Sequence, residues 1–89
     1  MTEQSKLHEE ILNILTPLYR DVLERPDLDL TMELSARDVE SWDSLNHITL
    51  IVEVETLTGL VFTTDELITL ENLGDFVKLL VSKGFKPAS

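Results

Sequence analysis

Asp43, Ser44 and His47 are the residues of this chain whose types and spacing could support covalent chemistry. A serine can act as a nucleophile when a histidine takes its proton, and residues three apart lie on the same side of a helix. A hydrolase, however, also needs an oxyanion hole and a third group that orients the histidine across a pocket. The sequence indicates neither, so a hydrolase is the weaker interpretation, and we expect His47 to pack at the edge of the core.

No metal site is indicated by the sequence either. His8, the other histidine, is far from His47 along the chain and is expected to be an ordinary polar residue of the first helix. The acidic residues lack the spacing of a calcium-binding loop, and the chain contains no cysteine that could supply a thiolate. We therefore predict no permanently bound metal.

The element that must position Ser44 is a predicted helix over residues 44–58. Its apolar periodic run begins directly after Asp43, a residue type that caps helices. The run ends at Gly59, which can adopt the left-handed conformation that closes a helix. This helix has more apolar residues than one buried face requires. One stripe contains Leu50, Ile51, Val54 and Leu57, and a second, offset stripe contains Leu45, Ile48 and Val52.

The second stripe begins beside the serine, because Ile48 lies four residues after Ser44 and Val52 eight residues after it. A small helical protein can hardly bury both stripes, so we expect this one to be exposed, with the acidic residues Glu53 and Glu55 at its edges. An apolar strip with charged edges is typical of a protein-docking surface. The alternative is that packing against another helix covers it.

Helical periodicity also predicts a first helix that ends near Glu24. Pro17 lacks the N–H that a helix interior requires, so we expect a kink or a break near Thr16. Pro26 restricts the residue before it to extended conformations, so residues 26–41 are expected to form a long ordered loop. The apolar residues of the helix are Leu7, Ile11, Ile14, Leu15, Leu18, Tyr19 and Val22, and those expected to hold the loop to the core are Leu28, Leu30, Leu34 and Val39.

Two shorter helices are expected to follow residue 59. Thr63 or Thr64 can cap a short third helix, and Asn72 with Asp75 resembles a capping box at the start of a last helix that ends at Gly84. No segment alternates with the period of a strand. The sequence therefore predicts an all-α fold of four helices with a long first loop and a short third helix.

The composition limits both the size of the fold and the class of partner. A chain of 89 residues fits one small domain, and it lacks room for a deep enclosed active site. The formal net charge is -10, which disfavours nucleic acids and anionic membranes and favours basic protein partners. No Lys or Arg occurs between Arg37 and Lys78. With neither a secretory signal nor a long apolar segment indicated, we expect a cytoplasmic protein with no membrane contact.

The run Trp42-Asp43-Ser44-Leu45 resembles the Asp-Ser-Leu motif of acyl carrier proteins. The similarity continues after the serine through a helix closed by Gly59, Phe62-Thr63, a short acidic helix, Leu70 and a final helix. It also includes the preceding loop, DLDLTMELSARDVESW. The resemblance covers nearly the whole chain and implies one carrier domain over residues 1–89, with an ordered core of about 5–84.

This resemblance implies that Ser44 carries a covalent 4'-phosphopantetheine arm, derived from coenzyme A, whose thiol holds an acyl or aminoacyl group. Asp43 would then be a recognition residue for the phosphopantetheinyl transferase, or simply a helix cap. The partner-binding residues would be Asp43, Leu45, Ile48, Val52, Glu53 and Glu55. The chain would be a monomeric, non-enzymatic carrier that serves acyl-loading and acyl-transfer enzymes with basic docking patches, in fatty-acid, polyketide or related biosynthesis. The rival hypothesis is a small acidic interaction module with a carrier-like fold that does not use the serine.

The sequence also departs from the family pattern. Thr58 stands where an aromatic residue is common, and Leu57 where an acid is common. Positions that are frequently acidic on the recognition face are here Asn46, Thr49 and Thr56. These differences favour a specialised carrier whose partners rely more on the apolar stripe.

Two further expectations concern packing. Trp42 is expected to pack the loop against the start of the helix rather than to serve as a docking anchor. A cleft that shelters an acyl chain could form between the second and third helices, although ordinary core packing would explain the same apolar residues. Those residues are Leu50, Ile51, Val54, Phe62, Leu67 and Ile68.

Overall fold

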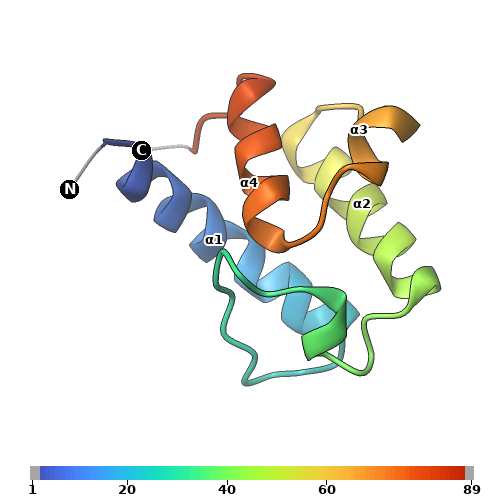
Figure 1. Ribbon diagram of the computed structural model, residues 1–89. Helices are drawn as coiled ribbons and strands as arrows, with labels where there is room; N and C mark the ends of the chain where they lie inside the picture. Colours follow the sequence, from blue (N-terminus) through green and yellow to red (C-terminus); the bar gives the residue numbers. More distant parts are fainter. Residues whose placement is uncertain (1–2, 88–89) are drawn as a thin grey trace.

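The computed structural model describes residues 3–87 and contains four α-helices and one short 3-10 helix within that range. The α-helices are α1 (Glu3–Val22), α2 (Ser44–Thr58), α3 (Thr64–Ile68) and α4 (Leu73–Ser82), and the 3-10 helix is η1 (Ala36–Asp38). Helix α1 packs against both α2 and α4, and the short α3 lies at the far side of α2 from α1 (Figure 1). The predicted all-α class, long first loop and short third helix are confirmed.

Helix α1 is continuous across Pro17, so the expected break near Thr16 is wrong. Pro17 is exposed and deprives the helix of one hydrogen bond, whereas the apolar face beside it is buried. Thr16 instead supplies an extra bond within the helix, from its Oγ1 to the carbonyl of Leu12 at 2.7 Å. The helix ends at Val22, slightly earlier than expected, and Glu24 turns the chain with a positive φ of 55°.

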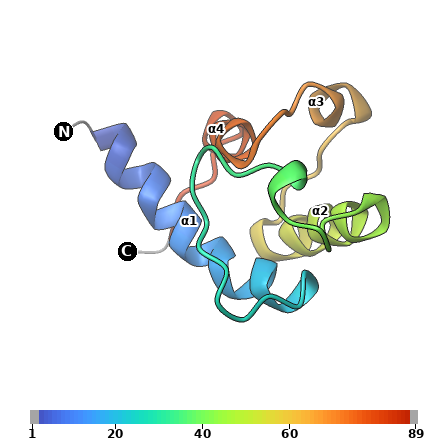
Figure 2. The same ribbon diagram turned by 60° about the horizontal axis from the view of Figure 1, so that its bottom comes forward.

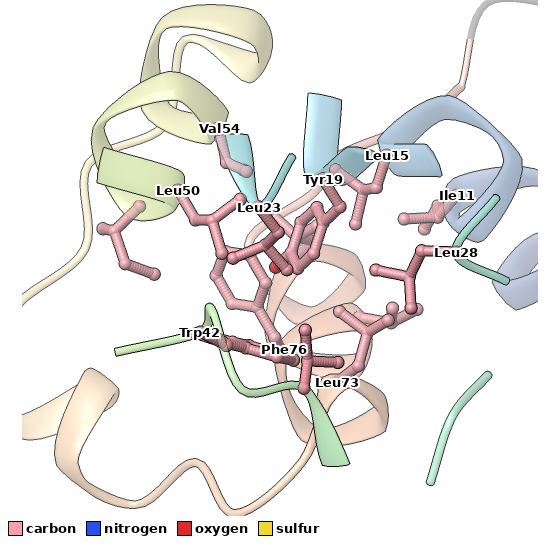
Figure 3. Packing of buried hydrophobic residues seen from close by; sticks show 14 of the residues in the cluster. Ile11, Leu15, Tyr19, Leu23, Leu28, Trp42, Leu50, Val54, Leu73 and Phe76 are labelled. Carbon is pink, nitrogen blue, oxygen red and sulfur yellow. The ribbon is translucent and has the colours of Figure 1, made fainter. Parts of the chain in front are cut away.

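The core is one cluster with contributions from α1, α2, α4 and the loops between helices. Tyr19 points into the middle of this cluster, and Trp42 enters it from the loop that precedes α2 (Figure 3). The two rings meet edge to face with centroids 5.6 Å apart. Trp42 is buried and its ring is stacked on that of His47 in the first turn of α2, so the prediction that it packs the loop against the start of the helix is confirmed.

The long loop from residue 23 to residue 43 passes close to the first turn of α4 before it reaches α2 (Figure 2). Two short hydrogen bonds hold it there, from Leu73 N to the oxygen of Leu34 and from Gly74 N to the oxygen of Met32, both 2.7 Å long. Leu28 and Val39 are buried, and the other two predicted anchors of the loop, Leu30 and Leu34, are partly buried. The sequence did not predict η1.

Local capping bonds fix the ends of the two C-terminal helices. Thr63 caps α3 by accepting a hydrogen bond from Glu66 N, and the Glu66 carboxylate in turn accepts one from Thr63 N. Asn72 caps α4 as expected. The expected capping box is incomplete, however, because the carboxylate of Asp75 accepts from Glu71 N. Helix α4 ends at Ser82, and the predicted glycine follows it at Gly84 with a φ of 91°.

Candidate functional site

Ser44 is the first residue of α2, and its side chain is exposed. Asp43 caps the helix, because its Oδ1 accepts a hydrogen bond from Asn46 N at 2.9 Å. The helix-capping role considered for Asp43 is therefore present, and it does not conflict with a role in recognition. The first N–H groups of a helix have no intrahelical partner, and the positive end of the helix dipole lies beside the serine. A negatively charged group attached to Ser44 would be stabilised there.

Two side-chain hydrogen bonds tie the start of α2 to the preceding loop and to Leu23, the residue after α1, and the sequence did not predict them. Ser41 Oγ donates to the carbonyl of Leu23 at 2.7 Å, and Asn46 Nδ2 donates to the carbonyl of Ser41 at 2.7 Å. Asn46 is thus turned back toward the loop, and it holds the segment that presents Ser44. Only the small polar residue types at these positions hinted at such a role.

His47 does not form a hydrolytic triad with its neighbours. Its Nδ1 accepts a hydrogen bond from Trp42 Nε1 at 3.1 Å, and the two rings are stacked with an interplanar angle of 29°. The carboxylate of Asp43 is engaged by Asn46 N rather than by His47. The orienting group on the histidine is therefore an indole, which supplies no charge to a catalytic imidazole. His47 lies partly buried at the edge of the core, as expected.

The second stripe of α2 is exposed, as its spacing predicted. The exposed fractions are 72% for Leu45, 60% for Ile48 and 52% for Val52. We call these three residues the exposed stripe. Leu50, Ile51 and Val54 are buried. Leu57 was assigned to that buried stripe, but it is 49% exposed.

The two acidic residues expected beside the exposed stripe differ in their surroundings. Glu53 is exposed. Glu55 is half-buried, and its Oε2 accepts a hydrogen bond from Phe62 N at 3.0 Å, so it also fixes the turn after α2. Glu53 is therefore the acidic residue beside the exposed stripe whose carboxylate makes no structural hydrogen bond among those described.

The threonines that replace family acids or an aromatic residue satisfy their hydroxyls within α2. Thr49 donates to the carbonyl of Leu45 and Thr56 to that of Val52, both at 3.1 Å. Thr58 donates to the carbonyl of Val54 and accepts from Leu60 N. The three hydroxyls are thus satisfied within α2 and the turn that follows it.

An open groove beside Ser44 shares part of its wall with a small, partly open cavity. The groove is lined by Ser44, Asp43 and Ile48, among others, and the cavity has a volume of about 80 Å³. Four residues line both spaces: Ala36, Trp42, His47 and Leu70. The rest of the cavity wall is mainly apolar and includes Tyr19, Ile51, Leu73 and Phe76.

This cavity differs from the cleft that the sequence suggested. Of the six apolar residues named for that cleft, Ile51 lines the cavity. Leu50, Val54 and Phe62 belong to the core, and Leu67 packs against it partly buried. Ile68 points outward with 73% of its surface exposed. The cavity instead lies against η1 and the segment between α3 and α4, a contact between distant parts of the chain. Burial raises the pKa of Tyr19 in its wall, so the phenol stays neutral.

Two absences apply to the part of the chain that the structure describes. Within residues 3–87, no group of three or more His, Cys, Asp or Glu side chains is arranged to hold a metal ion. None of the helices in that range combines the length and apolarity that a membrane crossing needs.

The chain is similar to holo acyl carrier protein from Geobacter metallireducens, whose solution structure was determined by NMR. The two chains are 42% identical, and the match covers 81% of this chain and 83% of the other with a TM-score of 0.76. No protein-family model matches the chain, and no curated protein sequence does.

Proposed function

Because the chain belongs to the acyl carrier protein family, we propose that it holds an acyl or aminoacyl group as a thioester on a 4'-phosphopantetheine arm attached to Ser44. Acyl carrier proteins are non-catalytic carriers that interact with a phosphopantetheinyl transferase and with biosynthetic enzymes. The observation that carries the proposal is the position of Ser44, which is exposed at the start of α2 beside an open groove. Residues 1–89 would form one cytoplasmic, monomeric carrier domain.

The residues around Ser44 fit the proposed arm. Its hydroxyl would lose a proton and attack the pyrophosphate of coenzyme A, whose P–O–P bond breaks to release adenosine 3',5'-bisphosphate. The phosphodiester that forms on Ser44 carries a negative charge, which the positive end of α2 would stabilise. The arm supplies a terminal thiol, which holds the cargo as a thioester. Asp43 and Asn46 keep the serine at a fixed place relative to the loop that precedes α2 while partner enzymes reach it. The groove beside Ser44 gives the arm a surface along which to lie.

We propose that partner enzymes dock on the exposed stripe. Leu45, Ile48 and Val52 offer an apolar contact that starts one residue from the attachment point. Asp43, Glu53 and Glu55 would orient a basic partner, with Glu53 the most available of the three. The low charge of this face compared with the family pattern favours partners that depend mainly on apolar contact. We expect these to be dedicated enzymes of fatty-acid, polyketide or related biosynthesis rather than shared housekeeping enzymes.

The test is covalent loading of the purified chain. The protein is incubated with coenzyme A, magnesium and a broad-specificity phosphopantetheinyl transferase, and its intact mass is measured. Wild type should gain the arm, and Ser44→Ala should not. Ser82→Ala is the matched control, because it removes a serine hydroxyl at the exposed end of α4, outside the site, and it should still be loaded.

Each other result rejects part of the proposal. A wild type that gains no arm would refute the carrier function, and loading of Ser44→Ala would refute the site. Ester hydrolysis by unmodified protein would revive the hydrolase hypothesis. Capture of a basic partner that is indifferent to Ser44→Ala, together with failure to load, would support the rival interaction module.

A further inference from the structure

Helix α3 is held to the rest of the protein by few interactions. None of its residues is buried, and the main contacts between helices are those of α1 with α2 and with α4. Leu67 packs against the core but stays partly exposed. Among the hydrogen bonds of residues 3–87, the two that join α3 to the region of α4 run from the ammonium of Lys83 to the carboxylate of Glu66. Lys83 directly follows α4, so the position of α3 depends strongly on this one lysine.

The pair of Lys83 and Glu66 is the better formed of the two ion pairs described within residues 3–87. Lys83 Nζ lies 3.0 Å from Oε1 and 2.9 Å from Oε2 of Glu66, and the two side chains are 24% and 28% exposed. In the other pair, Arg20 and Asp29 are 3.6 Å apart, and Asp29 is almost fully exposed. Water and salt weaken an ion pair less when both side chains are partly buried. The pair at α3 is therefore the one expected to hold two elements together.

Lys83 also covers the aromatic residue that precedes α3. Its ammonium lies 5.7 Å from the centre of the Phe62 ring, a distance at which a cation and an aromatic face attract each other. The Phe62 ring in turn contacts that of Phe76 in α4, with centroids 5.3 Å apart. Phe62 is buried. Removal of the ammonium would therefore uncover part of Phe62 as well as break the bonds to α3.

No other cation of the described chain can take the place of Lys83. No Lys or Arg occurs between Arg37 and Lys78, so neither α2 nor α3 carries one. Lys78 is exposed on α4, and it belongs to neither of the ion pairs described within residues 3–87. Loss of Lys83 would thus leave the carboxylate of Glu66 without a cation at salt-bridge distance in that range.

We propose that Lys83 is a latch for α3. While Lys83 is bonded to Glu66, α3 stays against the end of α4. When the two bonds break, α3 separates from α4 as a unit and uncovers Phe62 and Leu67, whereas the core formed by α1, α2 and α4 remains folded. Anions that compete for the ammonium favour the open arrangement.

Opening would enlarge an apolar surface that already exists on this side of the protein. Val61 and Ile68, which flank the residues held by the latch, are 75% and 73% exposed in the closed arrangement. Exposure of Phe62 and Leu67 would join them into a larger patch of the kind that binds other proteins. The inference does not depend on an arm at Ser44, so it can fail while the proposed function stands, and the reverse also holds.

The experiment measures hydrogen exchange of backbone amides by NMR on the unmodified protein. The amides of Leu67 and Leu70 report on α3, because both are hydrogen-bonded there, and that of Val54 reports on the core. In wild type, Leu67 and Leu70 should share one opening constant that is larger than that of Val54. Their opening should depend weakly on urea, since it exposes few side chains, whereas that of Val54 should depend on it strongly.

Variants at residue 83 test the latch. Lys83→Met keeps the apolar stem without the charge, and the opening constants of Leu67 and Leu70 should rise together by about five-fold. Lys83→Arg can still bond both carboxylate oxygens and should stay close to wild type. Lys78→Met is the matched control, because it removes an exposed lysine of α4 outside the pair, and it should leave both constants unchanged.

Salt provides a test that needs no variant. Raising sodium chloride from about 0.1 M to about 1 M screens the pair of Lys83 and Glu66, so the exchange of Leu67 and Leu70 in wild type should approach that of Lys83→Met. In Lys83→Met the same change in salt should have little effect on these amides, because the pair is already absent.

Each other result rejects the proposal. Unchanged opening of Leu67 and Leu70 in Lys83→Met, or an equal rise in Lys78→Met, would show that the ion pair does not hold α3. Different opening constants at the two amides, or the same constant at Leu67 and Val54, would show that α3 does not open as a unit. If Lys83→Met does not fold, as judged by circular dichroism, the salt dependence of wild type decides. Faster exchange in α3 at high salt then supports the latch, and unchanged exchange rejects it.

Discussion

Gly74 lies in the first turn of α4. For its replacement by alanine, helix propensity predicts a gain in stability and packing predicts a loss. Alanine is the better helix former by about 1 kcal/mol, so propensity alone predicts a more stable protein. The structure predicts a less stable one, because a Cβ at residue 74 would lie 2.7 Å from the main-chain oxygen of Met32. That same oxygen accepts a hydrogen bond from Gly74 N at 2.7 Å, so the loop cannot retreat without losing the bond.

The expected cost of Gly74→Ala combines these terms. Overpacking costs about 1–3 kcal/mol, the lost hydrogen bond about 1 kcal/mol, and the gain in propensity offsets about 1 kcal/mol. The free energy of unfolding should therefore fall by about 1–3 kcal/mol, and each kcal/mol should lower the melting temperature by about 4–8 °C in a domain of this size.

Urea unfolding followed by the fluorescence of Trp42 measures this change, because Trp42 is buried in the folded protein. Asn13→Ala, at an exposed position of α1, is the control for propensity without a clash and should raise stability by a few tenths of a kcal/mol. A Gly74→Ala variant as stable as wild type, or more stable, would show that the loop is not held against α4 as described.

Three further predictions concern substitutions at single positions. Asn46→Ala should lower the free energy of unfolding in urea by about 1–2 kcal/mol, because it removes the donor to the Ser41 carbonyl. Asn46→Asp should also destabilise the protein, although a negative charge suits the start of a helix. An Asp variant as stable as wild type would argue against the hydrogen bond from Asn46 to Ser41. The pKa of Glu66 is lowered in the folded protein, first by the backbone N–H of Thr63 and then by Lys83. The contribution of Glu66 to stability is therefore present above its unfolded pKa and is lost as the pH falls through its lower folded pKa. In thermal melts between about pH 5 and pH 3, the melting temperature of Glu66→Gln should fall less than that of wild type. Equal falls would contradict this. Gly59→Ala should cost about 1 kcal/mol in the same unfolding assay, because Gly59 has a φ of 74° with no atom near its would-be Cβ; a larger loss would point to a packing role instead.

Local signals made the ends of α2 predictable from the sequence. Asp43 and Gly59 act through bonds and conformations that involve only residues within one or two turns, so their residue types are sufficient evidence. The split of α2 into a buried and an exposed stripe was predictable for the same reason, since helical spacing fixes which residues share a face. The placement of Leu57 was wrong because its burial depends on how far the neighbouring helices extend, and spacing does not contain that information.

Tertiary contacts account for what the sequence did not show. Pro17 was expected to kink or break α1, and the break does not occur because the apolar face of the helix is buried along its whole middle part. The turn of Asn46 toward the carbonyl of Ser41, and the pairing of His47 with Trp42, depend on how the loop returns from α4 to α2. The cavity has the same origin, because its wall combines η1, α2 and the segment before α4.

Local signals and tertiary contacts determine different parts of the site. The attachment point depends on the helix start at Ser44, which Asp43 defines locally, so it can persist in sequences whose loops differ. The shape of the cavity beside Trp42 and His47 depends on the register between the long loop and α4, which the bonds to Leu73 N and Gly74 N fix. A change that shifts this register, such as Gly74→Ala, should therefore alter the fluorescence emission of Trp42 while Ser44 is still loaded. Loading that failed in a folded Gly74→Ala protein would show that the two parts of the site are not separable.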